Sequence, residues 1–389
     1  MSESYKFSAP AWDVTFEADR LRREKHELIG ELTVRCGLPG ALVINGCLST
    51  ADFNFSSLRA RQDRARHLGE RAKTNGKLDW FGLLEDFCQR VFVAERSGTP
   101  ACDLRALQRP SRGDDIYVEG LTFPRRHPSI LFGDGGAAKS YTALFLVGRL
   151  AQRGLSVALF DWELCGEDHR ERLELLFGTS MPCILYCRCE RPLTVEADRL
   201  RRVVRDNNVD YAIYDSVAFA CDGRPEDAEV AGRYFRAVRE VNCGSLHIAH
   251  VNRSEENDKK PFGSSFWHNG ARCTWFVQAS EQAGDEHILR LGFFNRKANL
   301  GPLRSPASFR IEFGSDRTVF QRADITDAPD LAGKLSVWQR MKYLLRRGSM
   351  PADDIALQID ADIETVKREA RRRRQDFILL DGGRIGLVG

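Results

Sequence analysis

A glycine-rich loop that ends in lysine and serine is the segment of this sequence with the clearest chemical role. Its residues are Gly133-Asp134-Gly135-Gly136-Ala137-Ala138-Lys139-Ser140, and Tyr141 follows. Glycines let backbone N–H groups turn toward phosphate oxygens, while the lysine reaches the terminal phosphates and the hydroxyl binds Mg²⁺. An apolar run, Ile130–Phe132, precedes the loop and a helical stretch follows it, so the start of that helix would also face the phosphates. We therefore predict that residues 133–141 bind ATP and that Ser140 is a ligand of Mg²⁺.

The residue before the lysine departs from the usual pattern, because Ala138 stands where a glycine is expected. A methyl group there could tighten the loop or reposition its backbone. We expect ATP to bind, and the effect of Ala138 on hydrolysis is left open.

An apolar strand that ends in a carboxylate supplies the second half of a nucleotide site. The segment Val209–Ser216 is largely apolar up to Asp215. An aspartate at the C-terminal end of a strand beside the loop can hold the Mg²⁺. We predict that Asp215 and Ser140 together bind the metal, although an aspartate that only caps a strand would give the same pattern.

Short apolar runs alternate with helical stretches between about residues 116 and 325. Strands are expected over 129–132, 156–160, 183–187, 210–214 and 245–249, with helices over 140–153, 168–177, 196–207 and 227–241. This alternation is typical of a mostly parallel sheet with crossover helices. The later runs 274–279, 287–294 and 308–313 are expected as antiparallel strands at one edge. The predicted fold class is therefore α/β, with residues 116–325 as the nucleotide-binding domain.

The two flanking regions look different from this central part. Residues 1–110 are expected to form a mainly helical domain of unassigned role, with helical spacing over Asp13–Cys36 and amphipathic helices over Ser56–Lys73 and Leu78–Arg96. Residues 334–389 show three helix candidates and then a hairpin, the order of a winged helix-turn-helix. That region carries 12 Lys/Arg against 8 Asp/Glu, a net charge of +4, with Lys367–Arg374 on the third helix. We expect duplex DNA to bind there, although a solvated basic helix is the plainer interpretation.

The order of the central motifs resembles the RecA-like ATPases of the RepA and DnaB type, over roughly residues 120–315. In that class a glutamate after the strand that follows the P-loop helix activates the attacking water. The resemblance assigns this role to Glu163, with Asp161 as the alternative, and makes Lys139 the catalytic lysine at the phosphates. It also makes His250, at the end of Leu246–His250, a sensor of the γ-phosphate. A solvated loop acid at 163 and a structural histidine at 250 are the competing interpretations.

The same resemblance implies that basic residues reach a neighbouring subunit. Arg272 follows a Gly-Ser stretch and would act as an arginine finger, and Lys297 would also reach across the interface, with Arg296 as a substitute. Ordinary surface charge is the alternative for each. Members of the class work as rings, so we expect a homo-oligomer, in one version a hexamer, with single-stranded DNA passing through it. The polar segment 251–261 falls where the class has a loop that faces nucleic acid.

Composition narrows the functional classes only a little. The net charge of +3 is nearly neutral for 389 residues, and no apolar run approaches the 18–20 residues of a membrane span. The sequence starts without the apolar core of a signal peptide and has 11 cysteines, from which we expect free thiols and a cytoplasmic location. Three functions fit: a DNA-dependent ATPase motor such as a helicase, a nucleotide-switched regulatory DNA-binding protein, or a P-loop kinase for a small molecule.

Overall fold

The computed structural model describes residues 4–74, 77–98, 101–108, 115–251, 265–281 and 285–388. By its internal contacts the chain divides into two compact units, Met1–Pro110 and Ser111–Gly389. Among the helices in these ranges, none has both the length and the apolar character that crossing a bilayer requires.

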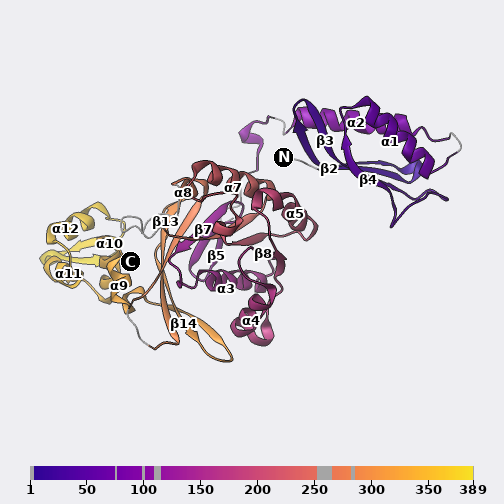
Figure 1. Ribbon diagram of the computed structural model, residues 1–389. Coiled ribbons are helices and arrows are strands. Elements are labelled where there is room, and N and C mark those ends of the chain that lie inside the picture. The colour runs from indigo at the N-terminus through magenta and orange to yellow at the C-terminus, as the bar shows by residue number, and fades with distance from the viewer. Residues whose placement is uncertain are drawn as a thin grey trace. The chain divides into compact units, whose positions relative to one another are not determined.

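The first unit is an antiparallel sheet covered on one face by two helices, so the prediction of a mainly helical domain is wrong (Figure 1). The sheet order is β1-β2-β3-β4. The elements are β1 (Tyr5–Ala9), β2 (Val14–Glu24), β3 (Glu27–Cys36), β4 (Cys47–Asn54), α1 (Leu58–Arg71) and α2 (Trp80–Ser97).

The error lies in Asp13–Cys36, which was expected to be helical and forms the hairpin of β2 and β3. Val14, Phe16 and Ala18 alternate with less buried residues and point into the core, which is the period of a strand. The two expected amphipathic helices are present as α1 and α2. Their apolar faces pack on the sheet around aromatic residues, among them Phe55 and Phe87.

The second unit is built on a nine-stranded sheet in the order β15-β14-β13-β12-β7-β11-β10-β8-β9. Its strands are β7 (Pro128–Gly133), β8 (Val157–Asp161), β9 (Leu185–Arg188), β10 (Tyr211–Asp215), β11 (Gly244–His250), β12 (Cys273–Ala279), β13 (Ile288–Ala298), β14 (Ala307–Phe313) and β15 (Thr318–Ala323). The strands from β12 to β9 run parallel, and β13, β14 and β15 add on antiparallel. The predicted mostly parallel α/β sheet with an antiparallel edge is confirmed.

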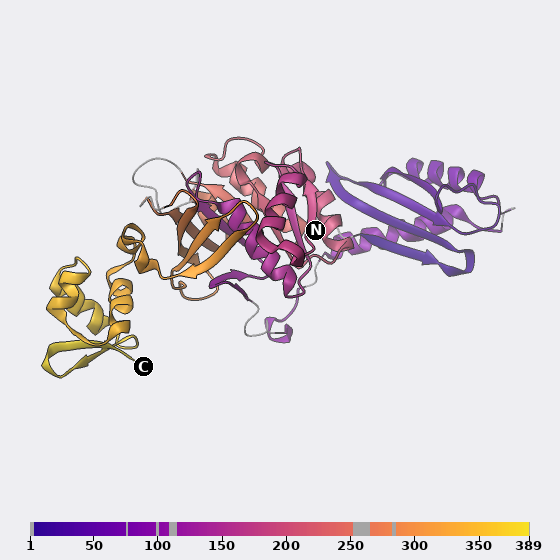
Figure 2. The same ribbon diagram turned by 90° about the horizontal axis from the view of Figure 1, so that it is seen from below.

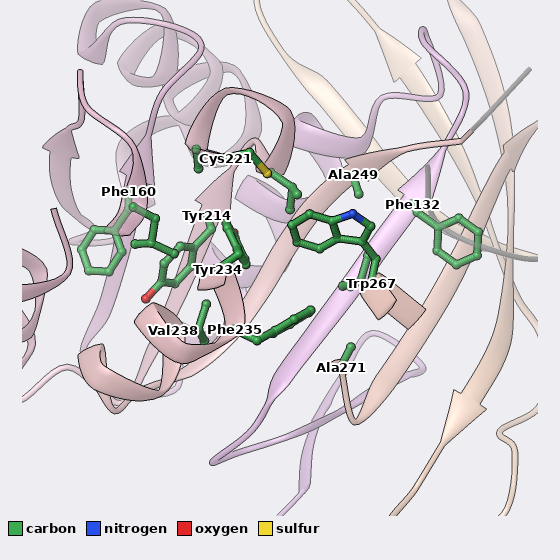
Figure 3. Close-up of a cluster of buried hydrophobic side chains, with 14 of the residues drawn as sticks. Phe132, Phe160, Tyr214, Cys221, Tyr234, Phe235, Val238, Ala249, Trp267 and Ala271 are labelled. Atoms are coloured by element: carbon green, nitrogen blue, oxygen red, sulfur yellow. The ribbon is translucent and has the colours of Figure 1, made fainter. Parts of the chain in front are cut away.

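Helices cover both faces of this sheet, because alternate residues of its strands point to opposite sides. The helices are α3 (Lys139–Gln152), α4 (Gly166–Phe177), α5 (Leu193–Asp206), α6 (Val217–Ala220), α7 (Ala228–Val241), α8 (Ser265–Gly270) and α9 (Pro329–Gly333). A two-stranded ribbon of β5 (Asp115–Val118) and β6 (Leu121–Pro124) packs on the face that α3 covers. On the other face Tyr214, Tyr234 and Trp267 gather between the sheet and α7, as Figure 3 shows.

The apolar core on the α7 face continues beyond the last strand. Ala328, Leu331 and Leu335 are buried in it, so the sheet and its covering end near residue 335.

The remaining residues form a small body with its own core, coloured yellow in Figure 2. Its elements are α10 (Val337–Leu344), β16 (Met350–Pro351), α11 (Ala352–Gln358), α12 (Ile363–Arg372), β17 (Phe377–Leu380) and β18 (Arg384–Leu387). The strands make a sheet in the order β16-β18-β17. Met341, Ile355 and Val366, one from each helix, meet Phe377 and Ile385 from the sheet.

Candidate nucleotide site

The glycine-rich loop joins β7 to α3 at the C-terminal edge of the parallel strands. Gly133 lies against β12, where a Cβ would collide with the Val277 carbonyl, so a larger residue could not occupy this place. Gly136 has φ +79° and Ala138 has φ +45°, both in the left-handed region. Ala138 immediately precedes α3, so the position that departs from the usual pattern is also one where glycine avoids a steric cost.

Lys139 is buried at the start of α3 and its amine points back into the loop. Nζ donates a hydrogen bond of 2.6 Å to the Asp134 carbonyl and lies 3.4 Å from Nδ1 of His250. β11 pairs directly with β7, with His250 opposite Gly133, which explains how a residue 111 positions away reaches the lysine. Burial, and then the Lys139 charge, lowers the pKa of His250 and favours its neutral form.

Ser140 and Asp215 meet where the metal is expected. Ser140 Oγ donates a hydrogen bond of 3.1 Å to Oδ1 of Asp215, which is 2% exposed. Burial raises the pKa of Asp215 to about 6, against the lowering effect of the Ser140 hydrogen bond. A hydroxyl and a buried carboxylate are ligands that Mg²⁺ accepts, and a divalent cation would offset the cost of burying this charge. The two residues therefore fit a Mg²⁺ site.

Glu163 and Asp161 follow β8 but have different surroundings. Glu163 is exposed and lines a pocket of about 280 Å³ together with Lys139, Ser140 and His250. Asp161 is fully buried, and its carboxylate accepts hydrogen bonds from the backbone N–H groups of Glu163 and Leu164. Of the two candidates for the water-activating carboxylate, Glu163 is the one with access to the pocket.

Arg172 was not predicted as a site residue, yet it lines the same pocket beside Tyr141. Its guanidinium lies 5.7 Å from the centre of the Tyr141 ring, and the Tyr141 hydroxyl donates a hydrogen bond of 2.9 Å to Thr318 on β15. The only sequence signal for Arg172 is its place in the charged stretch after Glu163. The contact between Tyr141 and Thr318 joins residues that are 177 positions apart, so nothing near Tyr141 in the sequence predicts it.

Arg272 and Lys297 lie toward the ends of the strands that are farther from the loop. Arg272 precedes β12, and its backbone N–H donates to the Pro128 carbonyl at the start of β7, whereas the loop starts at Gly133, opposite Val277. Five strand residues separate these levels, which is about 16 Å. Neither residue is therefore placed to act on the nucleotide site of its own subunit.

The two basic residues also differ from each other. Arg272 is exposed, whereas the amine of Lys297 donates to the carbonyls of His268, Asn269 and Ala271, at 2.7, 3.0 and 2.8 Å. These carbonyls end α8, so Lys297 caps that helix. Arg296, the substitute for Lys297, lies against the rings of Phe276 and Phe294. The predicted nucleic-acid loop, 251–261, lies outside the described residues except for Val251.

Helix α12 presents most of its arginines to solvent. Arg368, Arg371 and Arg372 of the helix are exposed, as is Arg374 just beyond it, whereas Arg373, which caps the helix, stacks on Trp338 at 4.2 Å and pairs with Glu369 at 3.2 Å. Arg373 therefore has a structural contact, while the arginines of α12 itself form an exposed basic face.

Comparison with known proteins gives structural likeness only. No family model matches the chain, and no curated protein matches it. The ATPase domain of G40P is 13% identical, with 51% of this chain and 86% of that chain covered at a TM-score of 0.42. A KaiC-like protein from Pyrococcus horikoshii OT3 is 17% identical, covering 51% of this chain and 91% of its own at 0.40.

A third structure is that of a DnaB-like replicative helicase, described with its interactions with primase. It is 14% identical, with 67% of this chain and 76% of that chain covered at a TM-score of 0.42. At 13–17% identity these three structures show a likeness of fold alone. What the site of this chain can do is decided by the side chains described above.

Proposed function

We propose that this protein binds and hydrolyses ATP as a RecA-like ATPase of the RepA type and acts on DNA as a ring. The observation that carries the proposal is one pocket, at the C-terminal edge of a parallel sheet, lined by Lys139, Ser140, Glu163 and His250, with Asp215 behind Ser140. A phosphate-binding lysine, two metal ligands and an accessible carboxylate are the groups that ATP hydrolysis needs.

Each residue has a distinct part in the proposed reaction. The loop N–H groups and Lys139 hold the phosphates, and Ser140 and Asp215 would hold Mg²⁺, which neutralises phosphate charge when bound. Glu163 orients the attacking water and accepts its proton. His250, held beside Lys139, senses the terminal phosphate at the end of β11.

ATP turnover with and without single-stranded and duplex DNA tests this proposal, with Lys139→Ala as the control. We expect DNA-stimulated turnover that falls to background in the variant, because the lysine contacts the transferred phosphate. A folded protein that binds no ATP contradicts the proposal.

The position of Arg272 supports the proposed ring. Its side chain is exposed at the edge of the sheet away from its own loop, so it can assist hydrolysis only at the nucleotide of a neighbouring subunit. Mixing two inactive variants tests this directly. Lys139→Ala subunits keep the arginine and Arg272→Ala subunits keep the loop, so mixed rings should regain part of the native turnover. No recovery on mixing, with each variant folded, contradicts supply in trans.

For the C-terminal body, we propose a winged helix that binds duplex DNA. The support is its order of helices and hairpin together with the exposed arginine face of α12, the helix that would enter the major groove.

A second candidate function is a regulatory DNA-binding protein without motor activity, in which the ATPase core works as a slow nucleotide switch. Two observations favour this candidate: Ala138 holds a left-handed backbone conformation, and Lys297 caps α8. Neither arrangement is expected in an efficient motor, which needs an unstrained phosphate loop and a basic residue free to reach the neighbouring subunit. Sizing with ATP separates the candidates: a hexameric ring supports the motor, and a monomer or dimer supports the switch.

A further inference from the structure

At the end of β8, two buried residues that fix the backbone are followed by one exposed residue with a functional side chain. Asp161 and Trp162 are buried, at 0% and 6% exposure, and the next residue, Glu163, is exposed in the pocket. A loop carboxylate that must meet a water molecule needs a fixed backbone, since small displacements of a catalytic group lower the rate strongly.

The Asp161 carboxylate gathers the backbone around Glu163. Oδ1 accepts the N–H groups of Glu163 and Leu164 at 2.9 and 3.0 Å, and Oδ2 accepts the Tyr186 hydroxyl at 2.9 Å. Arg188 lies 3.5 Å from Oδ2 and also donates to the Leu164 carbonyl. Residues of β9 thus hold the turn that carries Glu163, chiefly through the buried Asp161 carboxylate and also through the bond of Arg188 to the Leu164 carbonyl.

Other groups around this carboxylate keep it charged. Burial by itself raises the pKa of Asp161, but His169, whose Nε2 lies 3.5 Å from Oδ2, the two backbone N–H groups and Tyr186 outweigh it and hold the pKa at about 2. Asp161 therefore accepts hydrogen bonds throughout the neutral pH range.

Trp162 fixes the same turn from its other side. Its backbone N–H donates to the Asp215 carbonyl at 2.7 Å, and its indole Nε1 donates to the Arg191 carbonyl at 2.8 Å. The ring lies 6.1 Å from that of Tyr214 in a stacked arrangement. Glu163 thus follows a fixed backbone, and its side chain is exposed at the pocket.

We propose that Asp161 is a positioning residue that orients Glu163 for hydrolysis by holding the backbone of its turn, with Tyr186 as its partner. This inference rests on the proposed ATPase function. Asp161 itself does not line the pocket and takes no part in the chemistry.

Kinetics of the full-length protein test the proposal. Asp161→Asn should leave the Kd for ATP within about threefold and lower kcat by about 10- to 100-fold, with KM little changed, because only orientation of the water is lost. Tyr186→Phe should act in the same direction more weakly. Asp210→Asn is the matched control: Asp210 accepts the Ser156 N–H at 2.9 Å at the other end of β8, so its loss should leave kcat unchanged.

The double variant Asp161→Asn/Glu163→Gln separates positioning from general damage. If both residues serve one step, its kcat should equal that of Glu163→Gln alone, since residues that act as a unit are non-additive. Native kcat in Asp161→Asn, when Glu163→Gln is inactive, overturns the positioning role and leaves the ATPase proposal intact. Native kcat in Glu163→Gln overturns both residues' roles, and absence of ATP binding by the native protein overturns the function itself. If Asp161→Asn does not fold, Tyr186→Phe and the double variant Tyr186→Phe/Glu163→Gln take its place, and native kcat in Tyr186→Phe overturns the positioning role.

Discussion

Single residues of the nucleotide site carry costs that reflect their function. Ala138 holds a left-handed backbone conformation that costs an alanine roughly 1–2 kcal/mol. Asp215 is a buried carboxylate whose ionised form is disfavoured in the absence of a cation. Both features lower the stability of the protein, and both lie where the proposed function needs groups for phosphate and metal.

Ala138→Gly should stabilise the protein by about 0.5–1 kcal/mol, because relief of the steric cost exceeds the entropy that glycine loses on folding. Ala137→Gly is the matched control: Ala137 is buried and is not among the residues with positive φ, so it should destabilise. Chemical denaturation measures both. A loss of stability in Ala138→Gly as large as that in Ala137→Gly contradicts the prediction.

Asp215→Asn should raise the free energy of unfolding at pH 8 by about 1–3 kcal/mol while it abolishes Mg²⁺-dependent turnover. The folded pKa of about 6 lies above the ordinary aspartate value of 3.8, so this carboxyl's contribution to stability is present below pH 3.8 and is lost as pH rises through 6. The gain should therefore shrink toward pH 4. Asp161→Asn should show the opposite sign at neutral pH, because that pKa is lowered to about 2. Denaturation curves at several pH values, without Mg²⁺, distinguish the two.

At the scale of elements, strand order brings distant residues together. β11 lies between β7 and β10, so His250 reaches the loop from one neighbour while Asp215 arrives on the next strand. At the other edge, Lys297 on β13 joins its hairpin to the end of α8. Two basic residues that look alike in the sequence thus have different structural positions.

Lys297→Met should lower stability by about 1–3 kcal/mol, because three carbonyls at the end of α8 lose their donor. Arg272→Ala should change stability by less than about 0.5 kcal/mol, as for other exposed residues, yet lower turnover by about 10³-fold if it is the finger. Thermal unfolding and ATP turnover of both variants check this pair. If Lys297→Met keeps its stability but loses turnover, Lys297 and not Arg272 is the residue that assists hydrolysis.

The strands of the sheet could be predicted where the signal is local, and the residues proposed for the site follow such strands. Gly133 to Ser140, Glu163 and Asp215 each follow a short apolar run, and runs of this kind predict strands. The N-terminal error has a physical cause: Val14 and Ala18 are four residues apart and Leu21 three further, a spacing that a helix and one face of a strand share in part. The cap formed by Lys297 and the contact of Tyr141 with Thr318 could not be predicted, because both depend on tertiary packing.

At the scale of the whole molecule, the C-terminal body adds a basic surface to a nearly neutral chain. Replacing Arg368, Arg371 and Arg372 by alanine should lower the slope of log affinity for duplex DNA against log salt by about 3, at about 0.9 per phosphate contact. Stability should be unaffected, since all three are exposed. Arg373→Ala is the contrasting variant, because its stacking on Trp338 makes it structural. An unchanged slope in the triple variant argues against DNA binding through α12.

The buried positions of Leu331 and Leu335 have a consequence for how such a chain could be recombined. A junction placed at the last strand would open the apolar interior of the sheet, whereas one placed after Leu335 would uncover the surface against which Tyr343 packs and break the ion pair of Arg346 with Asp324 at 3.7 Å. Exchange of the terminal body by gene fusion should therefore disturb the sheet least at that joint, so that the proposed ATPase unit could be combined with a different terminal body.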